Sequence, residues 1–330
     1  MESFLVLCYF NHSAPTYRSP KKEMLSLSSC WNSHRYEDGK HICHEASYLG
    51  FEYIELSHGL KVSHLPGIMQ VVKEGNIKIS SVHNFCPSPV EVMMDAPDAY
   101  EFTSHREDER HRALDLTERT IETAANLRAQ RVVVHLGTVP VKRYTDRLEA
   151  LTLAGKIYTR EYTKEKLDFV TARQKHSQVY LDRARAALDE LLPTCEKHRV
   201  ALGIETRSHY EQVPDEREML SLMNHYRDCP WIGFWHDFGH VQRKANLGLL
   251  DHAEFLAAIA PRLLGCHVHD VEWPARDHRV PFTAGGVDFD KLMPLVPKGI
   301  PLVWELSQSQ RRAQVEEKSA KWREKFGTWD

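Results

Sequence analysis

The chain has 330 residues, of which 42% are hydrophobic and 27% are charged, and this globular composition is sufficient for a large buried core. A formal net charge of −3 gives no overall basic excess, so a dedicated nucleic-acid-binding protein is disfavoured. No apolar run is long enough to cross a bilayer, and the short patch at residues 4–10 lacks the basic flank of a signal peptide. We therefore expect a cytoplasmic protein without a membrane partner, in which the seven scattered cysteines are reduced thiols.

The first part of the sequence alternates between predicted strands and helices. Residues 1–22, with their prolines and small polar residues, are predicted to form an N-terminal extension. Gly50 and Gly75 each follow a predicted helix, which suits a left-handed C-cap. In chain order, the pattern predicts a strand at 24–31, a helix at 38–49, a strand at 51–56, a helix at 63–74 and a strand at 77–84.

The rest of the chain repeats this alternation, with one long irregular stretch. Ser104 and Glu107 have the spacing of a capping box before a helix. Residues 138–162 are predicted to form either a lid or a short helical insertion. The further elements predicted are a strand at 131–137, a helix at 163–198, a strand at 200–205, a helix at 219–226, a strand at 231–237, a helix at 251–260, a strand at 264–270, a helix at 289–296, a strand at 301–306 and a helix at 308–326.

Eight strands that alternate with helices define the predicted architecture. Strands that are apolar throughout are typical of parallel sheets covered on both faces. The fold class predicted is α/β, with a single (β/α)₈ TIM barrel at residues 23–330, preceded by the N-terminal extension and closed by a C-terminal helix. A doubly wound open sheet is the alternative, but the GxGxxG turn of dinucleotide-binding folds is absent.

Four of the predicted strands end in a potential metal ligand, namely Glu205, Asp237, His267 and Glu305. In a barrel, the carboxyl ends of different strands meet at one mouth, so side chains far apart in sequence converge. Three carboxylates and one imidazole suit one hard or borderline divalent cation, with Mn²⁺ favoured and Mg²⁺, Co²⁺ or Zn²⁺ as alternatives. The competing interpretation is that each residue is an isolated strand-end side chain or helix cap.

Further histidines accompany these strand ends. His240 follows Asp237 by three residues and is compatible with a second-metal ligand, a substrate contact or a helix-capping role. His267 and His269 alternate along one strand and point to the same side, so either one is a candidate ligand. Asp270 is then expected to orient the other imidazole.

Other candidates have less specific patterns. His83 and His135 end two earlier strands, and they either reach the mouth or are satisfied core residues. Arg207 and Arg279 are candidates for binding an anionic or polyol substrate, with a solvated surface arginine as the alternative. The remaining acids near strands are interpreted as structural, and the aromatic residues near strand ends as pocket walls or core: Glu45, Glu52, Glu55, Trp31, Phe85, Trp235 and Trp304.

Together these motifs resemble the xylose isomerase-like barrel superfamily, which includes sugar phosphate isomerases and epimerases, ketose 3-epimerases and enzymes of the endonuclease IV type. The resemblance covers about residues 24–307. The matching segments are Gly203-Ile204-Glu205-Thr206, the DxxH motif Asp237-Phe238-Gly239-His240, His267-Val268-His269-Asp270, the loop from Asp277 to Gly286, and Glu305.

The resemblance implies one divalent metal ion held by the four strand-end residues. One departure bears on the metal count, because Arg279 stands where the three-metal endonucleases carry the histidine of a D-x-H motif. Loss of that nitrogen ligand favours a single-metal sugar site over a trinuclear zinc site. The residues expected to bind the substrate are His83, His135, Arg207, His240, His269, Asp277 and Arg279.

The sequence leaves several functions open. The first is a metal-dependent isomerase or epimerase of a sugar or sugar derivative, in which Glu205 and Glu305 transfer a proton on carbon through a metal-stabilised enediolate. A lyase or dehydratase on an oxidised sugar or glycoside shares this enolate. The other classes are metal-dependent phosphodiester hydrolysis, as in endonuclease IV, and a barrel that only binds a partner. The expected partner is a small-molecule sugar, a homo-oligomer is left open, and the loops at 87–103 and 138–162 are expected to set specificity.

Overall fold

The eight predicted strands form one closed parallel barrel, which confirms the predicted fold class. The computed structural model describes residues 24–92 and 97–327, so the predicted extension at 1–22 lies outside the described residues. Around the barrel the strands pair in the order β1-β12-β9-β8-β6-β4-β3-β2, which places each strand beside its neighbours in sequence. The barrel strands are β1 (Met24–Ser28), β2 (Tyr53–Leu56), β3 (Lys78–His83), β4 (Arg131–Val134), β6 (Ala201–Glu205), β8 (Ile232–Asp237), β9 (Leu263–Val268) and β12 (Pro301–Trp304).

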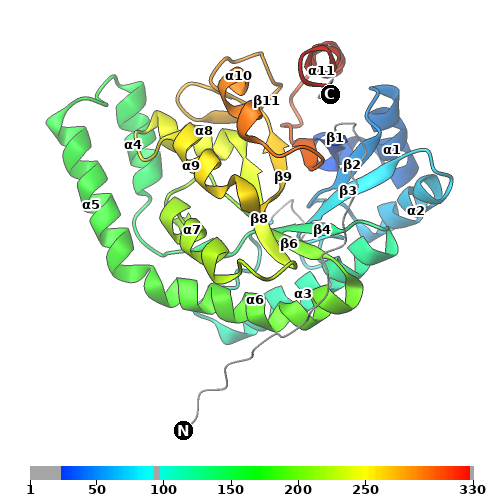
Figure 1. Cartoon of the computed structure of the whole chain (residues 1–330), viewed down its shortest axis with the longest axis horizontal. Coiled ribbons are helices and arrows are strands. Elements are labelled where there is room, and N and C mark those ends of the chain that lie inside the picture. Colours follow the sequence, from blue (N-terminus) through cyan, green and yellow to red (C-terminus); the bar gives the residue numbers. More distant parts are fainter. Residues whose placement is uncertain (1–23, 93–96, 328–330) are drawn as a thin grey trace, which may run out of the picture.

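Helices connect the strands and surround the barrel (Figure 1). Two short antiparallel pairs lie outside it, β5 (Gly137–Thr138) with β7 (Gln212–Val213) and β10 (Asp270–Glu272) with β11 (Arg276–Arg279). Among the described residues, no helix combines the length and the apolar character needed to span a membrane. The helices are α1 (Gly39–Tyr48), α2 (Leu65–Lys73), α3 (Glu107–Asn126), α4 (Tyr144–Leu153), α5 (Arg160–His176), α6 (Gln178–His198), α7 (Glu216–His225), α8 (Phe238–Asn246), α9 (His252–Ile259), α10 (Phe289–Leu292) and α11 (Arg312–Phe326).

The stretch between β4 and β6 differs most from its prediction. Residues 138–162 contain α4, which agrees with the helical insertion rather than the lid. The single helix predicted at 163–198 is two helices, α5 and α6, which meet at Ser177. The helices α4 and α5 form a hairpin at one side of the barrel, drawn in green in Figure 1, and they share a small core of their own that includes Leu148, Tyr162 and Phe169.

Two helix starts were also predicted differently. The prediction of a capping box at Ser104 and Glu107 is wrong, because Arg106 is the N-cap of α3. The Ser104 hydroxyl instead donates a hydrogen bond to the Glu109 carboxylate at 2.6 Å. The helix α8 was not predicted, although it begins directly after β8. Its N-cap is Asp237, whose Oδ1 accepts a hydrogen bond from the backbone N–H of His240 at 2.7 Å. The DxxH motif is therefore a strand end and a helix start at once.

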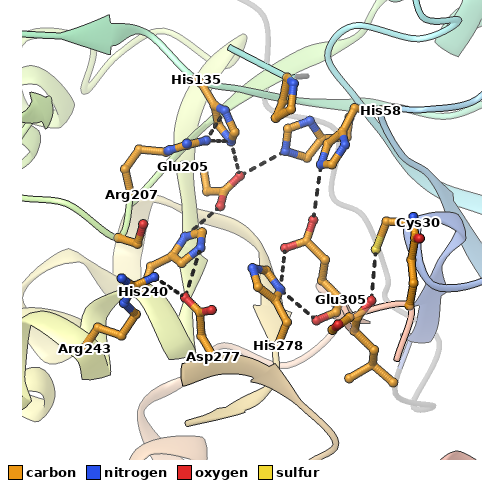
Figure 2. A pocket seen from close by; sticks show the side chains of 16 residues that line it. Cys30, His58, His135, Glu205, Arg207, His240, Arg243, Asp277, His278 and Glu305 are labelled. Carbon is orange, nitrogen blue, oxygen red and sulfur yellow. Dashed lines mark hydrogen bonds and ion pairs between the residues drawn. The ribbon is translucent and has the colours of Figure 1, made fainter. Parts of the chain in front are cut away.

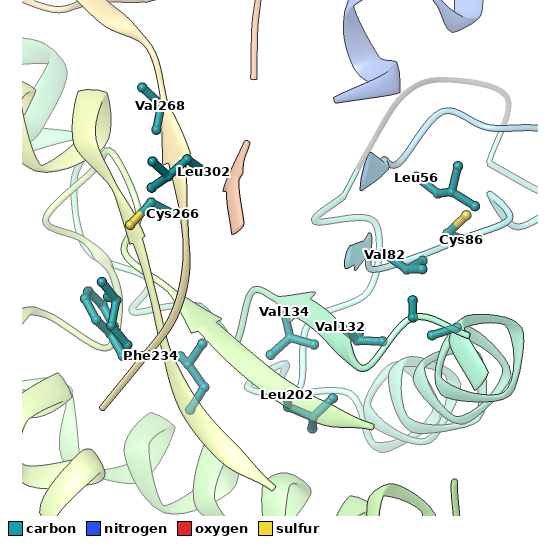
Figure 3. Close-up of a cluster of buried hydrophobic side chains, with 14 of the residues drawn as sticks. Leu56, Val82, Cys86, Val132, Val134, Leu202, Phe234, Cys266, Val268 and Leu302 are labelled. Atoms are coloured by element: carbon teal, nitrogen blue, oxygen red, sulfur yellow. The ribbon is translucent and has the colours of Figure 1, made fainter. Parts of the chain in front are cut away.

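Alternate residues of the barrel strands face opposite sides. The apolar side chains that point outward pack beneath the helices in one continuous core (Figure 3), including Val82, Val132, Val134, Leu202, Phe234, Cys266, Val268 and Leu302. His236 of β8 also points outward and contacts His252 of α9.

Inside the barrel, Val133, Trp235 and Val303 form a separate cluster without solvent exposure. Trp235 lies against Gly203 and Gly265, where an added Cβ would press on its indole ring. This packing fills the centre of the barrel beneath the acids and histidines at the strand ends. Ser26 and Ser80, in the middle of β1 and β3, share a buried hydrogen bond at 2.8 Å.

Candidate active site

A cavity of about 470 Å³ opens at the carboxyl ends of the barrel strands (Figure 2). The predicted site residues that line it are His83, His135, Glu205, Arg207, His240, Asp277 and Glu305. Three further predicted residues, Asp237, His267 and His269, are fully buried and do not line the cavity. The lining also includes His58, Arg243 and His278, which were not predicted as site residues.

Four buried side chains from four strand ends converge, namely Glu205, Asp237, His267 and Glu305, and we call them the four-residue cluster. Each offers one potential ligand atom, and these atoms lie within 4.8 Å of one another. The Nδ1 atom of His267 lies 3.5 Å from a Glu205 oxygen, 3.7 Å from Asp237 and 3.4 Å from Glu305. The structure therefore brings together the four residues that the sequence singled out.

The local structure fixes Asp237 from several sides. Its backbone N–H donates to the Thr206 hydroxyl at 3.0 Å, which ties the end of β8 to the residue after β6. While Oδ1 caps α8, Oδ2 accepts a hydrogen bond from Nε2 of His269 at 3.0 Å. Gly239 leaves the room for that imidazole, because a Cβ at this position would clash with the ring of His269. His269 thus positions Asp237 instead of reaching the cavity itself.

Glu55 faces one nitrogen of the His267 ring. Both Glu55 oxygens lie close to Nε2 of His267, at 3.1 and 3.2 Å, so Nε2–H donates to this carboxylate. Burial lowers the pKa of His267, but Glu305, Glu55 and Glu205 raise it well above the usual value, so the ring is protonated when no cation is bound. Nδ1 has no hydrogen-bond partner although it is buried among three carboxylates, and a divalent cation there would displace its proton. A metal-bound histidine typically has this arrangement, with its other nitrogen donating to a carboxylate. The residues present therefore fit a divalent cation.

The electrostatics of the cluster also suit a cation. Burial by itself raises the pKa of Glu205, but His135 and His267 beside it hold that pKa well below the usual value. The pKa of Glu305 is likewise lowered, to about 2, because His267 and His278 outweigh the effect of burial. These carboxylates are thus ionised at neutral pH, as both metal binding and proton abstraction require.

A second group of ligand atoms shares Glu205 with the first. His83 and His135 end β3 and follow β4, and their Nε2 atoms lie 3.1 and 2.9 Å from Oε2 of Glu205. We call these three residues the second cluster, and their potential ligand atoms also lie within 4.8 Å of one another. Both histidines therefore reach the cavity and are not core residues remote from it.

The rim of the cavity is formed by Arg207, Arg243, Asp277 and His278. The guanidinium of Arg243 bridges Asp277, at 2.7 Å, and Glu149 of α4, at 2.8 Å. The helical insertion therefore contributes to the site through Glu149. On the facing side, Arg207 pairs with Asp98 at 2.7 Å. Both guanidiniums of the rim already have carboxylate partners.

The structure places His278, and not Arg279, in the cavity wall. Along a regular strand, Asp277 and Arg279 would face the same side. However, His278 has a φ of 51°, and this left-handed conformation interrupts the alternation. Asp277 and His278 therefore both face the cavity, while a guanidinium nitrogen of Arg279 lies 3.7 Å from Glu272 outside it.

Asp270 stabilises the hairpin of β10 and β11, which carries Asp277 and His278, in a way that was not expected. It does not orient an imidazole. Its carboxylate accepts hydrogen bonds from four consecutive backbone N–H groups, those of residues 284–287, at 2.8 to 3.1 Å. It thereby ties the loop after β11 to the end of β9, and the tie fixes the base of the hairpin that carries Asp277 and His278.

The fold and the site define a (β/α)₈ barrel with a cluster of acids and imidazoles at the carboxyl ends of its strands. The chain belongs to the xylose isomerase-like TIM barrel family, whose sequence model matches residues 43–326. No curated protein sequence is significantly similar to the chain.

Several solved structures have a similar fold. A D-tagatose 3-epimerase-like protein is 18% identical, with 90% of this chain and 95% of that chain covered and a TM-score of 0.62. The 3-keto-D-glucoside 4-epimerase YcjR from E. coli is 15% identical, with 92% and 100% covered and a TM-score of 0.63. The IolI protein with a bound zinc atom is 14% identical, with 90% and 95% covered and a TM-score of 0.60.

Proposed function

We propose that the protein is a divalent-metal-dependent isomerase or epimerase of a sugar or sugar derivative. The observation that carries this proposal is the convergence of three carboxylates on the unpartnered Nδ1 of His267 at the mouth of the barrel. The structures with a similar fold include proteins named as 3-epimerases and a 4-epimerase, which supports a sugar substrate. The thiols of the described region form no disulfide, which fits a cytoplasmic enzyme.

The four-residue cluster would hold one cation, with Mn²⁺ favoured because three of the four groups offer oxygen. Such an ion supplies Lewis-acid polarisation of a carbonyl and the neighbouring hydroxyl. Glu205 and Glu305 enter the cavity from β6 and β12, which are separated in the barrel by β8 and β9. One carboxylate removes a proton from carbon and the other returns one, and each such step typically contributes about 10²- to 10⁴-fold.

The cavity wall supplies the groups that orient the sugar. His240 keeps its Nδ1–H on the Thr206 carbonyl at 3.0 Å, so its Nε2 accepts a substrate hydroxyl hydrogen. His83, His135, Arg207 and Asp277 line the same space and can bind further hydroxyl groups. Fixing the sugar among these groups aligns its acidic carbon with the two glutamates.

Deuterium exchange on carbon tests the proposal across a range of sugars. The Mn²⁺-loaded protein is incubated in D₂O with a panel of ketoses, aldoses and 3-ketoglycosides, and NMR detects deuterium on carbon. We expect exchange with at least one of these compounds, and the product separates an isomerase or epimerase from a lyase that shares the first proton abstraction. Absence of exchange with every compound, in a protein that binds Mn²⁺, would contradict the proposal.

A variant assigns the step to the site. Glu305→Gln should abolish exchange, because the amide is not a base, while Mn²⁺ binding is only partly weakened. The matched control is Glu317→Gln on α11, an exposed glutamate whose side chain is 68% accessible. Full exchange by Glu305→Gln would show that its assigned role is wrong.

A second candidate function is metal-dependent phosphodiester hydrolysis. The second cluster favours it, since His83, His135 and Glu205 could hold another cation next to the first. Two bound metals would clamp the attacking and leaving oxygens of a phosphodiester. This candidate predicts at least two ions per chain and binding to abasic duplex DNA at moderate salt, whereas the sugar enzyme predicts one ion and no such binding.

A further inference from the structure

The barrel strand β3 contains one extra residue where it pairs with β2. Ile54 of β2 pairs with Ile79 of β3. The next residue of β2, Glu55, pairs with Ser81, so Ser80 is left without a counterpart. An extra residue of this kind is a β-bulge, and it changes which side of the sheet the following side chains face.

The bulge turns two consecutive side chains of β3 into the barrel. Ile79 and Val82 belong to the outer core. Ser80 and Ser81, between them, point inward, where each forms a buried hydrogen bond. His83 faces inward as well and lines the cavity. Without the extra residue, the regular alternation would direct Ser81 and His83 towards the outer helices, as it does Ile79.

Three buried hydroxyl groups form a chain inside the barrel that ends at Glu55. Oγ of Ser80 lies 2.8 Å from Oγ of Ser26 and 3.2 Å from Oγ of Ser81. Ser81 donates to Oε2 of Glu55 at 2.8 Å. Because a hydroxyl has one hydrogen and Ser81 uses its own on the carboxylate, Ser80 donates to Ser81 and Ser26 donates to Ser80. All three donors therefore point towards Glu55, and the chain strengthens its last hydrogen bond.

This last hydrogen bond fixes an orientation that His267 leaves open. Nε2 of His267 lies almost equally far from the two oxygens of Glu55, at 3.1 and 3.2 Å. The torsion that turns a glutamate carboxylate has broad minima, so this nearly symmetric contact does not determine the plane of the group. Ser81 donates to one oxygen and thereby sets that plane. Nε2–H faces Glu55 in the neutral and in the protonated ring alike.

We propose that Ser81 is a positioning residue of the four-residue cluster. Its hydroxyl fixes the carboxylate of Glu55, which holds the ring of His267 so that Nδ1 faces the three acids. This inference rests on the proposed metal-dependent function. Ser26 provides a matched control, because it is an equally buried hydroxyl of the same chain that does not contact Glu55.

Mn²⁺ binding by the intact protein, measured by titration calorimetry, tests this role. Because Ser81 acts through Glu55, the Mn²⁺ affinity of Ser81→Ala should fall by about three- to tenfold, no more than the smallest loss typical for a direct partner of a ligand. Ser26→Ala should keep the affinity of the unchanged chain. An equal loss in Ser26→Ala would overturn the inference, because the effect would then come from packing. An unchanged chain that binds no Mn²⁺ would instead refute the proposed function.

A second variant covers the case in which Ser81→Ala does not fold. Ser81→Cys is close in size, but its S–H group is a weak donor, so its Mn²⁺ affinity should also fall. Urea unfolding of the metal-free proteins shows which variants are folded. An unchanged Mn²⁺ affinity in either folded variant would show that the Ser81 hydroxyl does not position the cluster.

A double-mutant cycle tests whether Ser81 acts through Glu55. In Glu55→Gln the hydroxyl no longer faces a carboxylate, so adding Ser81→Ala should cost much less Mn²⁺ affinity than Ser81→Ala costs alone. If the two losses simply multiply, Ser81 does not act through Glu55 and the inference is wrong.

Discussion

The four-residue cluster and the rim are held in different ways. Each member of the cluster lies within one residue of the end of a barrel strand, and its partners are buried groups such as Glu55, Thr206 and His269. The rim residues come from the loop after β6, from α8 and from the β10–β11 hairpin. Their guanidiniums form ion pairs with Glu149 of the helical insertion and with Asp98 in the loop before α3. The difference indicates that the barrel would set the chemistry of the proposed enzyme, whereas the added segments would set which substrate fits.

The largest effect should come from removing the imidazole of the cluster. In His267→Ala the proposed cation would lose the single nitrogen ligand of the four-residue cluster, so Mn²⁺ affinity should fall by more than about 10²-fold, beyond the loss typical for an outer partner. Titration calorimetry with Mn²⁺ measures this, with His111→Ala on the exposed face of α3 as control. An unchanged Mn²⁺ affinity in a folded His267→Ala variant would show that the four-residue cluster is not the metal site.

The next effect concerns Glu55, which lies behind the cluster. Glu55→Gln keeps an acceptor for Nε2–H of His267 but removes the charge that makes this imidazole a better ligand, so Mn²⁺ affinity should fall about 10-fold. Glu45→Gln is the matched control, because Glu45 is also buried but bonds to Asn32 and Arg35. Equal Mn²⁺ affinities in the two variants would mean that Glu55 is only structural.

A third effect comes from the outer side of β8, behind the cluster. His252 of α9 is buried with Nε2 at 3.0 Å from Nε2 of His236, and burial lowers its pKa from 6.5 to about 3. Below pH 6.5 the unfolded chain takes up a proton at this imidazole and the folded chain does not. As the pH drops from 6.5 towards 3, the free energy of unfolding therefore decreases by at most about 1.4 kcal/mol per pH unit. Urea unfolding at pH 7.5 and 5.5 should show a smaller loss in His252→Gln; an equal loss would contradict this account.

The smallest effect is expected at the rim. In Glu149→Gln, Arg243 keeps Asp277 but loses its charged partner on α4, a loss of about 0.5 to 1 kcal/mol for a partly exposed pair. The sugar concentration for half-maximal exchange should rise about two- to fivefold, with Mn²⁺ affinity unchanged. Asp168→Asn, in an exposed pair with Lys164, is the control. A change in Mn²⁺ affinity in Glu149→Gln would contradict the separate roles of the cluster in metal binding and the rim in substrate binding.

The sequence was sufficient for the barrel and for the four-residue cluster. Both depend on positions at strand ends, which apolar runs that stop at an acid or a histidine mark directly. Arg243 had a readable signal that was missed, because it lies three residues after His240 and hence on the same face of a helix, but α8 itself was not predicted.

Other parts of the site depend on contacts or conformations that no local pattern encodes. Glu55 meets His267 across 212 residues of sequence, and its only hint was an acid inside an apolar strand. His278 enters the cavity through a left-handed backbone conformation at a residue that is not glycine. The break between α5 and α6 has no proline or glycine at Ser177, so the pattern predicted one continuous helix.

The packing of Trp235 inside the barrel has a kinetic consequence. Together with Val133 and Val303 it closes the barrel beneath the cluster, so the cavity has one mouth and a bound substrate would leave by the route through which it entered. In the proposed isomerase or epimerase, substrate and product would then occupy the same space in turn and never together. Each should inhibit turnover of the other competitively, and flux through the enzyme should follow the ratio of the two sugars in both directions.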